Sequence, residues 1–232
     1  LPYDITHIHH SIKNQGFGAS VNDAVSRSSS SYILVLNSDT EINGNILLPL
    51  CAAMSADSQL AVIIPASNDY IEKDFNRYLR QPGNYIRTYR LRGYAFLIRR
   101  SVFQEVGGFD PIFGRGYYED IDLGRRIYEH NWRIGVHPDS LIYHKGGGSF
   151  GRGLSYRKLK RRNRALYFSR YPSAQRNVLF LSGDCSLTDF PQSLLNTIDN
   201  VFQRGGIVHW LSTESATKIP CLHMKNSRAN LL

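Results

Sequence analysis

An aspartate follows a continuous apolar run near the start of the chain. Residues Tyr32–Leu36 are apolar throughout, which is typical of a strand buried on both faces, and Asn37, Ser38 and Asp39 come directly after it. A carboxylate in this place lies at the carboxyl edge of a sheet, where ligands of open α/β folds bind. Such an oxygen ligand suits a hard cation with a bound diphosphate. The alternative is a strand-end turn in which Asp39 caps the next segment.

Three acids begin a predicted helix in the middle of the chain. Glu119, Asp120 and Asp122 follow the glycine-rich loop Phe113–Tyr118. A carboxylate fixed at the start of a helix could act as a general base toward a substrate admitted by the loop. The alternative is that these acids only interact favourably with the positive end of the helix dipole.

A histidine followed by glycines is the third feature. His144 comes after the short apolar stretch Leu141–Tyr143 and before three consecutive glycines at 146–148. An imidazole could complete a metal site, and glycines let the backbone approach a ligand closely. The alternatives are an ordinary surface or packed histidine and a simple glycine hinge.

The elements that must position these residues indicate an α/β fold. Residues 66–92 are polar without a clear period and are predicted to be a long loop region. Strands are predicted at Ile5–Ile8, Tyr32–Leu36, Leu60–Ile64, Gly93–Ile98, Arg133–Val136 and Leu141–Tyr143, and helices at Ala19–Arg27, Asn45–Ala56, Glu119–His130 and Leu154–Tyr171, with a short one from Ser101.

The pattern restarts after Arg176. Asn177–Leu181, Pro191–Gln203 and Ile207–Leu211 indicate strand, helix and strand, which make one βαβ unit. A single βαβ unit cannot bury both faces of its sheet. It therefore either docks on the first part of the chain or begins a second domain, and we divide the chain into residues 1–172 and 173–232.

The positive charge is confined to one segment. The 232 residues carry a net charge of +9, yet residues 1–150 hold 15 basic and 15 acidic side chains. Such a basic block attracts an anion, which could be a nucleic acid, a phospholipid headgroup or a diphosphate. The excess comes from Arg152, Arg157, Lys158, Lys160, Arg161, Arg162, Arg164, Arg170 and Arg176.

The cysteines and the apolar runs limit the setting of the protein. Cys51, Cys185 and Cys221 are far apart and form no CxxC pair, so neither a disulfide framework nor a zinc site is expected. A reducing, cytoplasmic setting follows. The apolar runs are too short to span a bilayer, and the first residues lack the pattern of a signal peptide.

The order of the motifs resembles a known family. The motifs are Asn14-x-Gly-Phe-Gly-Ala, Asn37-Ser-Asp39, Arg99-Arg100, Gly107-Gly-Phe-Asp110, Glu119-Asp120-x-Asp122, His144-x-Gly-Gly-Gly and Arg162-Asn163-Arg164. Over residues 1–172 the chain is similar to the family 2 inverting glycosyltransferases with the GT-A fold. It most resembles the bacterial rhamnosyltransferase-like members that build O-antigen and other surface polysaccharides. The implied fold is a mixed sheet flanked by helices, here without the family's first strands, and residues 173–232 resemble the first βαβ unit of a GT-B domain.

The resemblance also implies roles for single residues. Asp39 would bind a divalent metal, Mg or Mn, and His144 would join the metal shell. Asp120 would be the catalytic base in its pair with Glu119, and the Gly114–Tyr118 loop would border the acceptor. Asn37 replaces the first acid of the family's DxD motif, so metal binding would depend more on Asp39, His144 and the diphosphate. The positions expected at the nucleotide-sugar are Asn14, Gly16, Phe17, Asn37, Gly93 and Tyr94.

The implied function is metal-dependent transfer of a sugar from a UDP- or dTDP-sugar to a glycan or lipid-linked acceptor. The basic segment 152–170 would add a peripheral contact with the inner face of the cell membrane. Two other interpretations stay open: a non-catalytic glycan-binding or scaffold fragment, and a basic nucleic-acid-binding module. We expect no nucleic-acid partner, because the charge is confined to one segment and the acidic motifs lie elsewhere.

Overall fold

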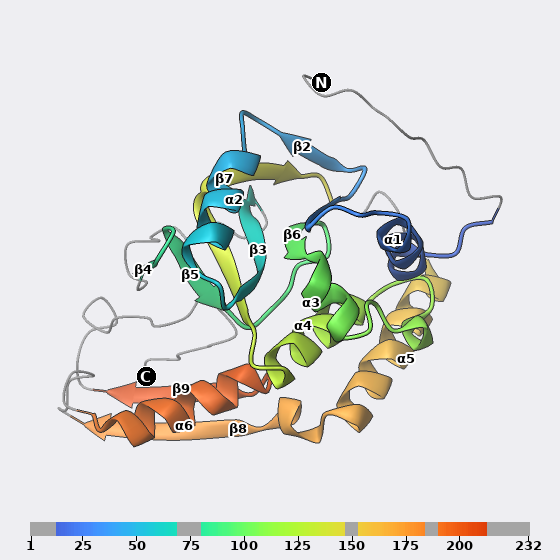
Figure 1. Cartoon of the computed structure of the whole chain (residues 1–232). Coiled ribbons are helices and arrows are strands. Elements are labelled where there is room, and N and C mark those ends of the chain that lie inside the picture. The colour runs from blue at the N-terminus through green and yellow to red at the C-terminus, as the bar shows by residue number, and fades with distance from the viewer. Residues whose placement is uncertain (1–12, 69–79, 147–152, 184–189, 213–232) are drawn as a thin grey trace.

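A computed structural model describes residues 13–68, 80–146, 153–183 and 190–212 (Figure 1). The predicted strand Ile5–Ile8 lies outside the described residues, as do Cys185 and Cys221. The elements of the first part are α1 (Phe17–Ser26), β1 (Tyr32–Leu36), β2 (Thr40–Ile42), α2 (Leu47–Ala56), β3 (Leu60–Ser67), β4 (Arg80–Gln81), β5 (Tyr85–Thr88), β6 (Ala95–Arg99), α3 (Arg100–Glu105), the 3₁₀ helix η3 (Pro111–Phe113), α4 (Glu119–Glu129) and β7 (Arg133–His144).

A mixed sheet forms the centre of the first part, as predicted. Its strand order is β1-β6-β3-β7-β5-β4, and β2 pairs with the end of β7. β3 and β7 run parallel, whereas β6 runs antiparallel to both β1 and β3. The continuous apolar runs arise because the central strands are covered on both faces, and every residue of β3 is buried.

Helices cover the two faces of this sheet unequally. Leu50 of α2 packs on one face with Ile63 of β3. The next residue of β3, Ile64, belongs to the opposite face, where it packs in one cluster with Val102 of α3 and Leu123 of α4. Figure 1 shows α2 on one side of the sheet and α1, α3 and α4 on the other. The fold is therefore a three-layer α/β arrangement.

Two predictions about the sheet were wrong. Residues 66–92 are not all loop, because β3 continues to Ser67 and β5 pairs with β7. Tyr85 and Ile86 of β5 are completely buried, but a strand of four residues is too short to show a period. The two strands predicted at 133–136 and 141–143 form one strand, β7. The polar residues between them occupy a register shift against Pro65 and Ala66 instead of a turn.

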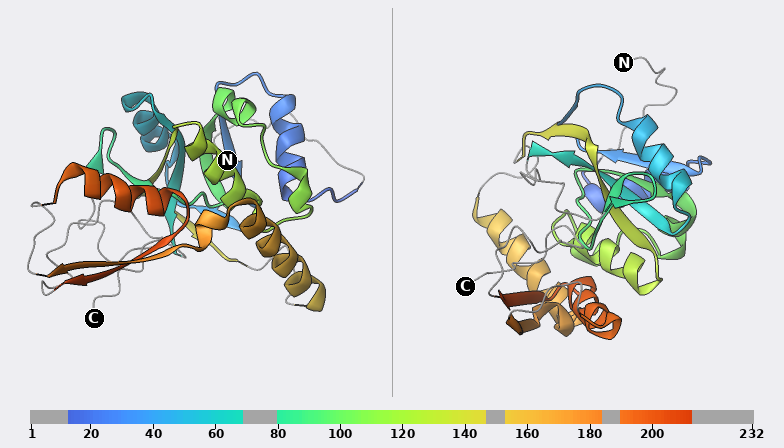
Figure 2. Two further views of the ribbon diagram at one scale, coloured as in Figure 1. Left: turned by 90° about the horizontal axis from the view of Figure 1, so that it is seen from below. Right: turned by 90° about the vertical axis from the view of Figure 1, so that its left-hand side faces the viewer.

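After β7 the chain continues with α5 (Leu154–Arg170) and the short 3₁₀ helix η4 (Pro172–Gln175). The helix packs on the first part through Asn163 and Tyr167, its buried residues, and Tyr167 shares a cluster with Phe113 of η3. Figure 2 shows α5 lying across one end of the sheet layer. No helix among the described residues is long and apolar enough to cross a lipid bilayer.

The predicted βαβ unit is present. β8 (Asn177–Gly183) and β9 (Ile207–Ser212) form a separate parallel pair joined through α6 (Gln192–Gln203). Tyr89 donates a hydrogen bond to Asp199 of α6 and its ring lies 6.2 Å from that of Phe202, so the unit contacts the first part. Leu179 and Leu181 of β8 remain 62% and 64% exposed. The contact with the first part of the chain therefore leaves part of the β8–β9 sheet exposed to solvent.

Candidate active site

The structure brings together the two residues predicted to bind a metal. Asp39 lies in the turn between β1 and β2, and the pairing of Thr40 with His144 places the end of β7 beside it. His144 Nε2 lies 3.4 Å from Asp39 Oδ1, and the two side chains are 15% and 14% exposed. The Asp39 Oδ1 atom is buried and has no hydrogen-bond partner. The pairing of β2 with β7 therefore joins two motifs that are far apart in the sequence.

Neighbouring strand ends hold this pair in place. The Tyr94 ring stacks on the His144 ring at 4.5 Å, and the Asn37 backbone N–H donates to the Tyr94 carbonyl at 2.8 Å. The side chain of Asn68 exchanges two hydrogen bonds with the backbone of His144. The hydroxyls of Ser67 and Tyr94 lie 2.7 Å apart. Ser67 and Asn68 were not predicted, although they follow an apolar strand just as Asn37 and Asp39 do.

The donor set of Asp39 and His144 fits a hard divalent cation that shares its ligands with a substrate. A carboxylate oxygen without a hydrogen-bond donor and a nearby imidazole nitrogen are common ligands of such ions. In the described part of the chain, no cluster of three or more His, Cys, Asp or Glu residues could hold a metal by itself. An ion at this pair would need oxygen atoms from diphosphate and water, which Mg²⁺ sites in proteins often use.

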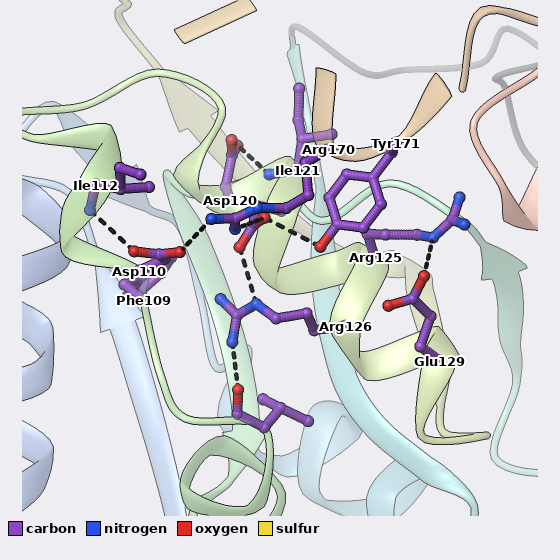
Figure 3. A network of polar contacts seen from close by, with 12 residues as sticks. Phe109, Asp110, Ile112, Asp120, Ile121, Arg125, Arg126, Glu129, Arg170 and Tyr171 are labelled. Atoms are coloured by element: carbon purple, nitrogen blue, oxygen red, sulfur yellow. Dashed lines mark hydrogen bonds and ion pairs between the residues drawn. The ribbon is translucent and has the colours of Figure 1, made fainter. Parts of the chain in front are cut away.

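The predicted base lies next to the same segment of chain. The Gly93 backbone N–H donates to Asp120 Oδ2 at 3.1 Å. The Ile121 N–H donates to Asp120 Oδ1 at 2.9 Å (Figure 3). A Cβ atom added to Gly93 would lie 3.3 Å from Asp120 Cβ and 3.4 Å from the Phe17 ring. Gly93, Phe17 and Asp120 therefore lie next to one another, and Gly93 permits this close approach.

Glu119 has a different environment from its neighbour Asp120. Its side chain is 8% exposed, and its Oε2 atom is buried without a hydrogen-bond partner. Burial, reinforced by the charge of Asp120, raises the pKa of Glu119 to about 8. At neutral pH Glu119 is therefore mostly protonated.

The predicted glycine turn before α1 is shaped by its own side chain. Asn14 Oδ1 accepts a hydrogen bond from the Gly16 backbone N–H at 2.9 Å. Gly16 has a φ of 88°, and a Cβ atom there would lie 2.5 Å from the Cα of Arg115. Asn14 and Gly16 thus hold the start of α1 against the Gly114–Tyr118 loop. Their described contacts do not reach Asp39 or His144.

Asp122, the third acid of α4, is structural. It is fully buried and forms ion pairs of 2.8 Å with Arg126 and with Arg170 of α5. Arg170 also pairs with Asp110 at 2.8 Å, so one cation of the basic segment joins α5 both to α4 and to the residue before η3 (Figure 3). Part of the basic segment therefore serves the fold and not a partner.

The outer side of α5 carries basic residues and an exposed apolar side chain. Leu154, Arg157, Lys158 and Arg161 follow the helical spacing of one face and line a shallow depression of about 380 Å³. Leu154 is 84% exposed. This outer face, defined by these four residues, combines three cations with an exposed apolar side chain.

Comparison with known proteins identifies the class of protein to which the chain is similar. Residues 1–115 match the family model described as glycosyl transferase family 2. Over 62 residues, the chain is 40% identical to N-acetylglucosaminyl-diphospho-decaprenol L-rhamnosyltransferase of Mycobacterium tuberculosis, strains CDC 1551 / Oshkosh and ATCC 25618 / H37Rv. That match covers 27% of this chain and 20% of the relative.

Solved structures share the fold at low sequence identity. GalNAc-T7 with UDP, GalNAc and Mn²⁺ matches 71% of this chain and 37% of its own length, with a TM-score of 0.54 and 15% identity. The mannosyltransferase PcManGT from Pyrobaculum calidifontis, in complex with GDP-Man and Mn²⁺, matches 68% of this chain and 44% of its own, with a TM-score of 0.51 and 14% identity. The chain thus spans less than half of each of these proteins.

The sheet, the flanking helices and these matches define the GT-A fold of glycosyltransferases. More particularly, the chain belongs to glycosyl transferase family 2, through its first 115 residues. The fold and family predicted from the motif order are therefore confirmed.

Proposed function

We propose that the chain is a metal-dependent inverting glycosyltransferase. It moves a sugar from a nucleotide-diphospho-sugar, such as a UDP- or dTDP-sugar, to a hydroxyl of a glycan or lipid-linked acceptor in surface polysaccharide synthesis. The observation that carries this proposal is the segment Gly93-Tyr94. The Gly93 N–H binds Asp120, and the Tyr94 ring stacks on His144. Two adjacent residues therefore connect the predicted metal ligands to the predicted base.

On the donor side, Asp39 and His144 would hold the divalent ion, Mg or Mn. When bound, such an ion neutralises the charge that develops on the diphosphate leaving group. The buried Asp39 Oδ1 atom supports this role, since it accepts no hydrogen bond although it lies beside His144 Nε2, and a buried carboxylate oxygen normally accepts one. The two solved neighbours, which were studied with Mn²⁺ and UDP or GDP-Man, add support for nucleotide-sugar and metal use.

On the acceptor side, Asp120 accepts the proton of the attacking hydroxyl. The N–H groups of Gly93 and Ile121 fix the orientation of its carboxylate, so the base needs no reorganisation before transfer. A base of this kind typically contributes about 10²–10⁴-fold to the rate. Attack on the sugar face opposite the diphosphate inverts the anomeric centre.

The relative and the outer face of α5 support the proposed acceptor and location. The Mycobacterium tuberculosis relative is named for a diphospho-decaprenol-linked sugar, which supports a lipid-linked acceptor. Arg157, Lys158 and Arg161 face outward beside Leu154, a combination that suits an anionic membrane surface. We therefore place the protein in the cytoplasm, with its basic segment at the inner face of the membrane.

Titration with UDP- and dTDP-sugars, with and without Mn²⁺, tests the proposal. We expect saturable binding that requires Mn²⁺ in the wild-type chain and is weakened at least about tenfold in Asp39→Asn. Glu41→Gln is the matched control, because Glu41 is an exposed acid close by on β2 that pairs with Lys145. Salt-sensitive DNA binding without nucleotide-sugar binding would favour the nucleic-acid module, and no binding of either would favour the scaffold fragment.

A further inference from the structure

The loop that leads into α4 has an unusual backbone. Tyr117 and Tyr118 have φ angles of 71° and 73°, in the left-handed region that residues with a side chain rarely adopt. Glu119 and Asp120 follow immediately. Two successive residues keep such a conformation only where the surroundings determine it strongly. The loop must therefore be held from outside, because its own sequence does not favour this turn.

One buried side chain of α5 provides that hold. Asn163 is completely buried, and its Nδ2 group donates to the backbone carbonyls of Phe113, Gly116 and Tyr117 at 2.7, 2.8 and 3.0 Å. Its Oδ1 atom accepts a hydrogen bond from Arg162 at 2.8 Å. An amide group has two N–H hydrogens, so the three carbonyls share them. A carboxylate of the same shape could donate to none of them.

The same helix also contacts the ring of Tyr117. The Tyr156 ring meets it edge to face at 4.9 Å, and Lys160 Nζ lies about 6 Å from both ring centres. Because the hydrogen bonds and the ring contacts both come from α5, this helix fixes the position of the Tyr117 backbone and of its ring. The loop is therefore shaped mainly by a helix that follows it by more than 30 residues.

We propose that Asn163 is a positioning residue for sugar transfer. Its hydrogen bonds fix the conformation of the Gly114–Tyr118 loop. In this way Asn163 orients the Asp120 side chain at the start of α4 and places Tyr117 next to the acceptor. This role rests on the function proposed above. With this role, α5 completes the acceptor side of the site. Asp39 and His144 on the donor side make no described contact with α5.

The test compares Asn163→Asp with Asn22→Asp. Asn22 is a matched control, since its Nδ2 group also donates to a backbone carbonyl, that of Phe109, at 2.8 Å. We expect Asn163→Asp to lower kcat/KM for the acceptor by about 10²-fold, because a small displacement of a catalytic group has effects of that size. Mn²⁺-dependent binding of the nucleotide-sugar should stay within about twofold of wild type, since the donor side makes no contact with Asn163. Asn22→Asp should leave the KM for the acceptor unchanged.

A second variant guards against misfolding caused by a buried charge. Asn163→Ser adds no charge and keeps one donor, so its kcat/KM for the acceptor should lie between those of wild type and Asn163→Asp. Hydrogen exchange of residues 112–120 should be faster in both variants. Transfer by the wild-type chain with unchanged acceptor kinetics in both variants would overturn the role of Asn163. Absence of transfer in the wild-type chain would overturn the proposed function, and this role with it.

Discussion

The donor side and the acceptor side of the candidate site are built in different ways. Asp39 and His144 stand at adjacent strand ends, and the pairing of β2 with β7 is enough to bring them together. Asp120 begins a helix after a left-handed turn, and residues of α5 hold that turn from outside. The donor side thus depends on strands of the sheet and the residues next to their ends, whereas the acceptor side depends on packing between distant segments.

This difference predicts that the two sides can be damaged separately. A change in α4 or α5 should reduce acceptor use or stability while the donor side still binds metal and nucleotide. A change at Asp39 should do the opposite. The following variants test this separation, beginning with the largest expected effect.

Asp120→Asn should lower the rate of transfer by about 10²–10⁴-fold, because the amide cannot accept the proton of the acceptor hydroxyl. The side chain keeps its size, so the melting temperature and nucleotide-sugar binding should stay close to wild type. Initial rates with a soluble acceptor measure the effect. Asp23→Asn, at a partly exposed acid of α1 that pairs with Arg27, is the control for loss of one negative charge. Transfer at the wild-type rate would show that Asp120 is not the base.

Asp122→Asn should lower the free energy of unfolding by about 3–5 kcal/mol, since removal of one partner leaves buried charges unpaired. Arg126 would lose its carboxylate partner, and Arg170 would keep only its ion pair with Asp110. Glu129→Gln is the matched control on the same helix, because the Glu129 side chain, which pairs with Arg125, is 46% exposed and should contribute at most about 1 kcal/mol. Urea unfolding compares the two variants, and equal losses would contradict the structural role of Asp122.

The sequence was most informative about residues that directly follow a strand. The proximity of Asp39 and His144 could be predicted because each comes after an apolar run, and strand ends collect at one edge of a sheet. β5 was missed because a strand of four residues shows too little periodicity. Asn163 stood in a recognised motif, but its role was not predicted. Its function depends on carbonyls of a loop about 50 residues earlier, and no local pattern records such a contact.

The outer face of α5 forms a third region, which should affect neither side of the site. Replacing Arg157, Lys158 and Arg161 with Gln should weaken binding to anionic vesicles by about 3 kcal/mol, or about 10²-fold, at about 1 kcal/mol per cation. Raised salt should have a similar effect. Lys160 is kept, because it contacts the rings of Tyr117 and Tyr156.

Sedimentation with vesicles of mixed neutral and anionic lipid measures this binding. A variant with Gln at Lys13, Arg27 and Arg204 removes the same charge elsewhere and is the control. Both triple variants should transfer sugar to a soluble acceptor at the wild-type rate, since Asp39, Asp120 and His144 are unchanged. If the α5 variant binds anionic vesicles as tightly as wild type at low salt, the membrane contact is wrong.

The smallest expected effect concerns Glu119, whose pKa in the folded protein is raised from an ordinary value of 4.5 to about 8. Below pH 4.5 the folded and unfolded states both keep the proton. Above it, the unfolded state releases the proton while the folded state retains it until about pH 8, so stability falls as the pH rises. Between pH 5.5 and 6.5, wild type should therefore lose up to about 1.4 kcal/mol relative to Glu119→Gln, which cannot ionise. Urea unfolding at the two pH values measures this difference, with Glu105→Gln as the control at an exposed glutamate. An equal change in wild type and Glu119→Gln would contradict the raised pKa of Glu119 and would mean that burial at the start of α4 does not hold its proton.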